Sequence, residues 1–107
     1  MIENVQERWH DLGIFSERLK KEVFDIGIDE VWVFCEKGVL KAVSNICPHK
    51  MGPVSRGMLK DSIIECPWHG YRFDIKSGSC ISHKCFYLRR YETKVENGCL
   101  FVKEVTQ

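Results

Sequence analysis

The chain has no long hydrophobic run, and this lack excludes a membrane-spanning helix. Its longest apolar stretch, residues 31–35, ends at Glu36, whereas a transmembrane helix needs about 20 apolar residues. The first eight residues are mixed in polarity and do not resemble a signal peptide. We therefore expect a cytoplasmic protein that does not bind membranes and keeps its thiols reduced.

An excess of charge of one sign is also missing. The sequence has 16 Lys and Arg residues against 15 Asp and Glu, and its formal net charge is +1. This balance provides no general attraction to nucleic acid, so nucleic acid is not an expected partner. The length of 107 residues allows one domain, which we expect to span residues 1–107, and leaves no room for a separate catalytic domain.

Helix signals are scarce, and short strand patterns fill most of the chain. Residues 30–36 are rich in β-branched and aromatic side chains, and Asn97-Gly98 stands between two β-rich runs, which is a strong signal for a type I′ hairpin. We predict an all-β fold of small antiparallel sheets. The expected strands cover residues 9–12, 30–36, 39–46, 62–65, 71–75, 86–96 and 99–105, with turns at Lys37-Gly38 and Ser77-Gly78 and one helical turn after Ser16.

Two short segments each bring a cysteine and a histidine together. Residues 47–49 read Cys-Pro-His, and residues 66–69 read Cys-Pro-Trp-His. The proline after each cysteine stiffens its loop, and the residues between the two segments are numerous enough to fold back and bring them face to face. The candidate metal ligands are therefore Cys47, His49, Cys66 and His69.

Three kinds of site fit these four residues. Tetrahedral zinc accepts two cysteines and two histidines, but zinc sites usually take ligands of the same kind from each local segment. A nucleophilic Cys-His pair needs only one of each and leaves the second pair unexplained. A [2Fe–2S] cluster with two cysteines on one iron and two histidines on the other uses all four. We favour the cluster, because chance does not readily place two of only four histidines in matched Cys-Pro loops.

The two segments resemble the cluster loops of soluble Rieske-type ferredoxins, which serve bacterial multicomponent oxygenase systems. The similarity extends to the run Cys-Pro-Trp-His-Gly-Tyr-Arg-Phe-Asp at residues 66–74, to Ser-Arg-Gly at residues 55–57 and to the closing hairpin at residues 91–102. It covers about residues 9 to 105, with the cluster-binding loops at about residues 46–74. The resemblance implies three small antiparallel sheets with a cluster-binding subdomain at one tip.

The resemblance also implies a role for each ligand and for the whole chain. Cys47 and Cys66 would bind the inner iron, and His49 and His69 the outer iron through Nδ1, with one cluster per chain. The protein would be a monomeric one-electron carrier without catalysis of its own. It would dock transiently, through the cluster tip, on a flavin-dependent NAD(P)H reductase and on a terminal oxygenase. The alternatives are a small Rieske subunit of a larger reductase, such as nitrite reductase, and a zinc-stabilised interaction module.

Several positions depart from the high-potential members of the family. The disulfide that joins their two loops would fall at Gly52 and Trp68, so it cannot form here. The hydroxyl-bearing positions near the cluster sulfurs correspond to Tyr71 and Phe73, and the covering loop at residues 79–84 lacks its proline. Fewer hydrogen bonds to sulfur stabilise the reduced charge less. We therefore predict a reduction potential near the lower end of the Rieske range, about −150 mV.

The remaining cysteines, histidines, tryptophans and basic residues have simpler interpretations. We expect Cys35, Cys99, Trp9 and Trp32 in the core, Cys80 and Cys85 as reduced thiols, and His83 on the surface. Trp68, between two ligands, is expected to be partly exposed. The basic residues near the loops, Lys50, Arg56 and Arg72, would serve either solubility or docking on an acidic patch of a redox partner.

Overall fold

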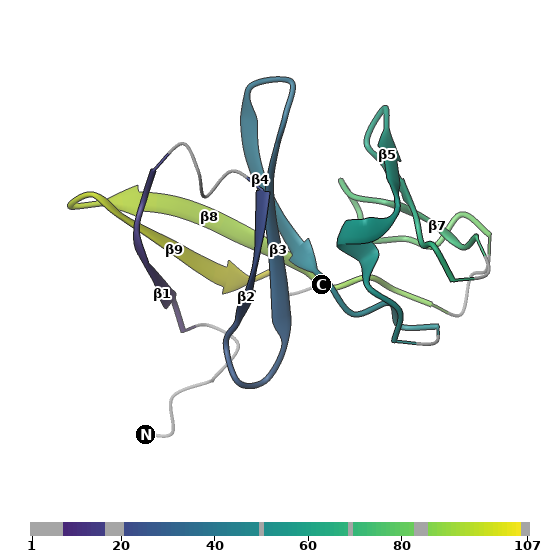
Figure 1. The fold of residues 1–107 in the computed structure, drawn as a ribbon, viewed down its shortest axis with the longest axis horizontal. Coiled ribbons are helices and arrows are strands. Elements are labelled where there is room, and N and C mark those ends of the chain that lie inside the picture. Colours follow the sequence, from purple (N-terminus) through teal and green to yellow (C-terminus); the bar gives the residue numbers. More distant parts are fainter. Residues whose placement is uncertain (1–7, 17–20, 50, 69, 83–85, 106–107) are drawn as a thin grey trace.

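Two antiparallel sheets form the described part of the chain, which we analysed as a computed structural model covering residues 8–16, 21–49, 51–68, 70–82 and 86–105 (Figure 1). The larger sheet has six strands in the order β1-β9-β8-β4-β3-β2, and the smaller has the order β5-β6-β7. The strands of the larger sheet are β1 His10–Ile14, β2 Lys21–Asp25, β3 Glu30–Glu36, β4 Val39–Ser44, β8 Arg90–Glu96 and β9 Cys99–Glu104. The smaller sheet contains β5 Met58–Lys60, β6 Ile63–Glu65 and β7 Arg72–Asp74, preceded by a short 3₁₀ helix, η3 Val54–Arg56.

The all-β prediction is confirmed, but the expectation of three sheets is wrong for the described residues. Pairing of Ala42 with Tyr91 and of Val43 with Arg90 joins β4 to β8. Strands β1, β9 and β8 therefore form one sheet with β4, β3 and β2 and not two separate small sheets. Strand β2 is absent from the predicted strands, and the helical turn predicted after Ser16 falls on residues 17–20, outside the described residues.

The predicted hairpin turns are confirmed by backbone geometry. Lys37 and Gly38 have φ of 52° and 80° between β3 and β4, and Asn97 and Gly98 have φ of 52° and 78° between β8 and β9. Positive φ at both central residues is the mark of a type I′ turn, whose twist matches that of the flanking strands. Both hairpins therefore close with two-residue loops, as the sequence predicts.

Strand β3 is buried on both faces because each face of the larger sheet covers its own core. Val31 and Val33 pack into one core with Leu100 and Val102. Trp32 and Phe34, on the other face, pack into the second core, which includes both candidate cysteine ligands. The prediction that Trp32 is buried is confirmed.

The expected burial of Cys35, Cys99 and Trp9 is not found. Cys35 is exposed because it lies near the hairpin end of β3, beyond the packed part of the sheet, although it shares a face with Val31 and Val33. Cys99 and Trp9 are only half-buried, near the outer end of the β8–β9 hairpin and just before β1.

Within the described residues, no helix is long and apolar enough to cross a membrane.

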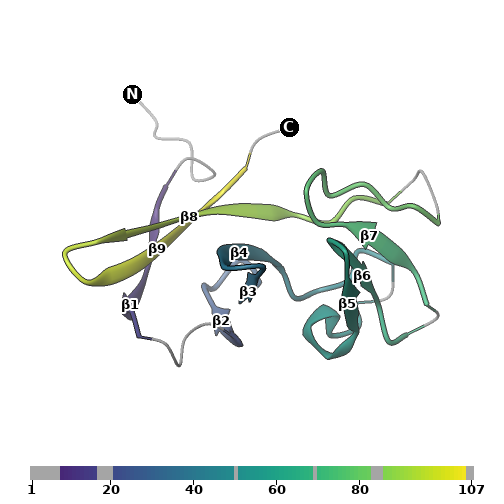
Figure 2. The same ribbon diagram turned by 90° about the horizontal axis from the view of Figure 1, so that it is seen from above.

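The smaller sheet is an insertion between two strands that pair with each other. Residues 45–89 leave the larger sheet after β4 and return to it at β8 (Figure 2). Asp29 holds the two ends of this insertion together: its carboxylate accepts hydrogen bonds from Ser44 Oγ at 2.8 Å and from the Tyr91 hydroxyl at 2.7 Å. Burial, followed by the Asp29 hydrogen bond, raises the pKa of Tyr91 above its ordinary range, so this hydroxyl stays a donor.

A second polar contact joins the two sheets at the β3–β4 hairpin. The carboxylate of Glu36 accepts hydrogen bonds from the backbone N–H and the hydroxyl of Ser62, both at 2.8 Å, and from Lys41 Nζ at 2.9 Å. Burial alone would raise the pKa of Glu36, but these donors outweigh it and lower the pKa to about 2. Glu36 is therefore ionised across the physiological range and fixes the smaller sheet to the larger one.

Candidate metal centre

The two candidate ligand loops lie on the smaller-sheet side of the molecule, away from β1 and the β8–β9 turn (Figure 1). The first loop follows β4 and begins at Cys47, and the second follows β6 and begins at Cys66. Both cysteines are buried, at 0% and 1% exposure, in the core between the two sheets. The fold therefore brings together two thiols that are nineteen positions apart in the sequence.

The two loops share one backbone design. The N–H of Cys47 donates to the carbonyl of Gly52 at 2.9 Å, and the N–H of Cys66 donates to the carbonyl of Tyr71 at 2.7 Å. In each loop the residue before that carbonyl is left-handed, with φ of 62° at Met51 and 69° at Gly70. Each cysteine therefore starts a closed loop of the same size, and the two loops face each other as structural equivalents.

The two thiols are close enough to interact directly. Cys66 and Cys47 lie within hydrogen-bonding distance, and the backbone N–H of Trp68 donates to the Cys66 sulfur. The pKa of Cys66 is raised to about 11, first by burial and then by the adjacent Cys47 thiol, against the opposing effect of that N–H. Both sulfurs must lose their protons to bind a metal, and the positive charge of a bound cation would stabilise the thiolates against the burial that favours the neutral form.

His49 presents its ring to the same region. Its Nδ1 atom is buried, and its imidazole stacks on Tyr71 with 3.7 Å between ring centroids and 13° between ring planes. Phe86 meets the imidazole edge-on at 5.5 Å. His69, the fourth candidate ligand, lies outside the described residues. Three of the four predicted residues can thus be placed, in two facing loops.

The aromatic surroundings of His49 were not anticipated from sequence. Phe86 comes from the segment that leads into β8, far in sequence from both ligand loops, and no spacing pattern links it to His49. Phe73 is fully buried in the same core as Cys47 and Cys66, so this position places no hydroxyl beside the sulfurs. Trp68 is 49% exposed, which confirms the expected partial exposure.

The basic residues near the loops provide less free charge than expected. Arg72 pairs with Glu65 at 3.1 Å, so a carboxylate partly neutralises it. Arg56 is exposed on η3, and Lys50 lies outside the described residues, as do His83 and Cys85. The exposed side chains next to the described ligands are instead apolar, namely Met51 and Trp68.

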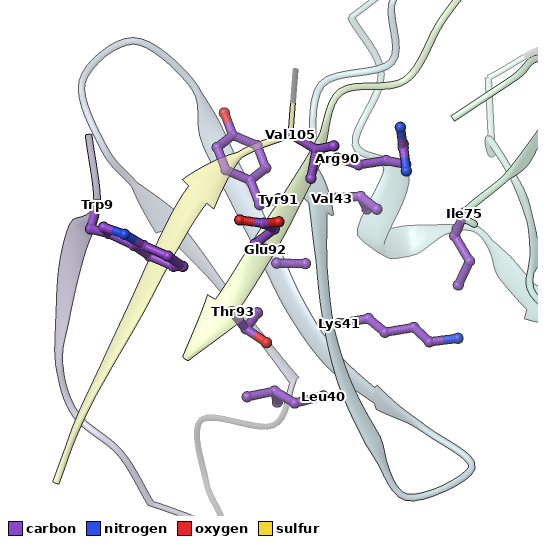
Figure 3. Close-up of a pocket in the computed structure, with 11 residues that line it drawn as sticks. Trp9, Leu40, Lys41, Val43, Ile75, Arg90, Tyr91, Glu92, Thr93 and Val105 are labelled. Carbon is purple, nitrogen blue, oxygen red and sulfur yellow. The ribbon is translucent and has the colours of Figure 1, made fainter. Parts of the chain in front are cut away.

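A surface hollow of about 460 Å³ lies along β4 and β8 and is not part of this centre (Figure 3). Its lining includes Trp9, Lys41, Ile75, Arg90 and Glu92, and it contains none of the described candidate ligands. The burial of the two cysteines in the ligand loops points to a buried metal centre.

A scan against protein families matches residues 11–92 to the Rieske [2Fe-2S] domain. The ferredoxin component of the p-cumate 2,3-dioxygenase system of Pseudomonas putida is 36% identical over 72 residues, which cover 65% of this chain and 61% of that protein. The ferredoxin component of the naphthalene 1,2-dioxygenase system of Pseudomonas putida is 28% identical over 93 residues, covering 84% of this chain and 89% of that protein.

Solved structures share the fold over nearly the whole chain. The ferredoxin of carbazole 1,9a-dioxygenase from Nocardioides aromaticivorans IC177 has a TM-score of 0.72 and 29% identity, and the match covers 87% of this chain and 96% of that one. A putative NADH-dependent nitrite reductase small subunit from Mycobacterium tuberculosis has a TM-score of 0.74 and 21% identity over 94% and 97% of the two chains. The second likeness concerns the fold alone.

Proposed function

Because the chain belongs to the Rieske [2Fe-2S] domain family, we propose that it is a ferredoxin that carries single electrons from a flavin-dependent NAD(P)H reductase to a terminal oxygenase. The observation that carries this proposal is the pair of matched loops, each of which starts at a buried cysteine. The ferredoxin components among its relatives support the same role.

The ligands in this proposal are Cys47 and Cys66 on the inner iron and His49 and His69 on the outer iron, with one cluster per chain. When bound, a [2Fe–2S] cluster supplies a one-electron redox couple. The described residues suit such a group, since the two thiols are adjacent and buried. The Nδ1 atom of His49, in the same loop as Cys47, is buried as well. The polypeptide excludes water from the sulfurs and leaves the exposed side of the loops for contact with a partner.

The ligand pattern favours a two-iron site over zinc. Each segment offers one cysteine and one histidine, whereas zinc sites usually take ligands of the same kind from each local segment. A Rieske cluster assigns two cysteines to one iron and two histidines to the other, and so uses all four residues.

A fixed subunit of a larger reductase is the second candidate, and it rests on the fold likeness to the putative nitrite reductase small subunit. A diffusing carrier should purify and sediment as a monomer, whereas a fixed subunit should co-purify with its large partner at constant stoichiometry. We place the carrier in the cytoplasm, where reducing conditions keep cysteines such as Cys47 and Cys66 available as ligands.

The test is to prepare the protein from iron-replete cells and measure its absorption and electron paramagnetic resonance (EPR) spectra with its iron and sulfide content. We expect two irons and two sulfides per chain, loss of the native signal in Cys47→Ser and His69→Ala, and its retention in the matched control Cys99→Ser. A colourless protein with stoichiometric zinc would contradict the proposal. Electron delivery is then checked by reconstituted turnover with a reductase and an oxygenase component.

A further inference from the structure

We propose that Tyr71 and Phe86 are positioning residues that hold the imidazole of His49 in its ligand orientation before the cluster is inserted. This inference rests on the proposed function, because His49 has to be oriented only if it binds the outer iron. The three rings come from three separate segments, namely the first ligand loop, the end of the second ligand loop and the segment before β8. We call these three rings the aromatic clamp.

The rings of the clamp all contact one another. Tyr71 lies flat on His49 at 3.7 Å, and Phe86 meets His49 at 5.5 Å with 75° between the planes. Phe86 also meets Tyr71 at 5.6 Å with an angle of 66°. The two edge-on contacts have the geometry that aromatic pairs prefer, and the stacked pair is in close parallel contact. His49 therefore lies in an aromatic corner with one face and one edge covered.

The backbone fixes the clamp relative to the thiols. The carbonyl of Tyr71 accepts the hydrogen bond from the N–H of Cys66 that closes the second loop, at 2.7 Å. The carbonyl of Phe86 accepts a longer bond from the N–H of Cys80, at 3.4 Å. The backbone of Tyr71 therefore belongs to the loop that carries Cys66, while its ring contacts the imidazole in the other loop.

A histidine on a loop can rotate about two side-chain torsions, and only a narrow range of orientations directs Nδ1 toward a metal. The stacked Tyr71 ring opposes rotation about the second torsion, and the Phe86 edge opposes tilting. Each aromatic pair biases an orientation by roughly two- to tenfold, and such supporting contacts are what hold metal ligands in place. The buried Nδ1 of His49 is consistent with an orientation set by the clamp.

The first test uses the protein without its cluster. The His49 ring protons should show large ring-current shifts in the NMR spectrum of the apo-protein, because they lie against an aromatic face. Tyr71→Leu should abolish most of this shift, and Tyr71→Phe should keep it because the ring remains. Unchanged His49 shifts in a folded Tyr71→Leu protein would overturn the proposal.

The second test uses the loaded protein. In Tyr71→Leu we expect altered EPR g values and cluster loss that is roughly two- to tenfold faster, with Tyr71→Phe close to the wild type. Phe86→Leu should give a smaller change in the same direction, and it serves as the second variant if Tyr71→Leu does not fold. Trp9→Leu, which removes a half-buried aromatic ring before β1, is the control and should change neither readout.

The outcomes separate the two proposals. If the wild type shows no [2Fe–2S] signal, the proposed function fails, and the positioning role fails with it. If the wild type carries the cluster and the Leu variants keep its g values and its lifetime, only the positioning role is overturned. If Tyr71→Phe behaves like Tyr71→Leu, the hydroxyl and not the stacked ring matters, and the clamp is likewise overturned.

Discussion

Gly52 and Trp68 lie directly against each other, one in each ligand loop. A Cβ atom built on Gly52 would lie 2.8 Å from Cγ and Cδ2 of the indole and 3.2 Å from Cβ of Trp68. Disulfide-bonded cysteines have Cβ atoms about 3.5–4.5 Å apart. The two loops therefore approach, at these two positions, to within a few tenths of an ångström of the spacing that a disulfide requires.

The double variant Gly52→Cys/Trp68→Cys should form a disulfide between the loops. The resemblance to the Rieske family places the disulfide of its high-potential members at these two positions, and only a small outward shift is needed here. Thiol titration and intact mass before and after reduction would detect it, with Trp68→Cys alone as the control. A folded double variant that keeps two more titratable thiols than the wild type after mild oxidation would contradict the proximity of these two positions.

The reduction potential should lie near the lower end of the Rieske range, about −150 mV. Phe73 is fully buried in the core that holds Cys47 and Cys66, and it brings no hydroxyl to stabilise the reduced cluster. Phe73→Tyr should therefore raise the potential, and Phe24→Tyr, on the far sheet, should leave it unchanged. A redox titration followed by EPR measures both, and a clearly positive wild-type potential would refute the interpretation.

Stability should fall in acid through Glu36. Its pKa is lowered from the ordinary 4.5 to about 2, so its contribution to stability is fully present above about pH 4.5 and is lost as the pH falls toward 2. We expect roughly 1–3 kcal/mol from this group. Denaturation curves between pH 2 and 7 should converge for wild type and Glu36→Gln in acid. A difference in stability between wild type and Glu36→Gln that stays constant with pH would show that Glu36 does not cause the loss of stability in acid. Glu22→Gln, at an exposed position of β2, is the control.

Gly57 should not tolerate a side chain, although its φ of −81° is ordinary for any residue. A Cβ atom there would lie 1.9 Å from the carbonyl oxygen of Glu65, and backbone cannot yield as a flexible side chain can. Gly57→Ala should lower the free energy of unfolding by about 1–3 kcal/mol. Thermal denaturation against Arg56→Ala, an exposed neighbour on η3, would measure the loss, and equal midpoints for the two variants would contradict the clash.

Local signals in the sequence predicted much of this fold, and long-range contacts account for what they missed. The turns at Lys37-Gly38 and Asn97-Gly98 were predictable because two adjacent residues determine a type I′ turn. The merging of two sheets depends on the pairing of Ala42 with Tyr91, forty-nine positions apart, and no local pattern encodes it. Exposure of Cys35 escaped prediction because period-two alternation gives the face of a strand but not where the core ends.

The candidate centre shows the same division. The matched Cys-x-His and Cys-x-x-His segments predict the ligands, and the structure places Gly52 against Trp68, the two positions at which the resemblance puts the disulfide of the high-potential members. The aromatic clamp was not predictable, because Phe86 reaches His49 from a segment with no motif of its own. Residues that act through a ligand are therefore harder to find from sequence than the ligand itself.

The pinning of Ser44 and Tyr91 by Asp29 has a consequence for how this protein can change over evolution. These contacts join the two ends, here called the neck, of the inserted segment at residues 45–89, here called the cassette. The cassette starts after β4 and ends before β8, and these two strands are hydrogen-bonded to each other in the larger sheet. Loop lengths, ring contacts and charges inside the cassette can vary without breaking the sheet below. Redox properties and partner choice can therefore be retuned separately from the scaffold, or transplanted as a unit through cuts on either side of the neck.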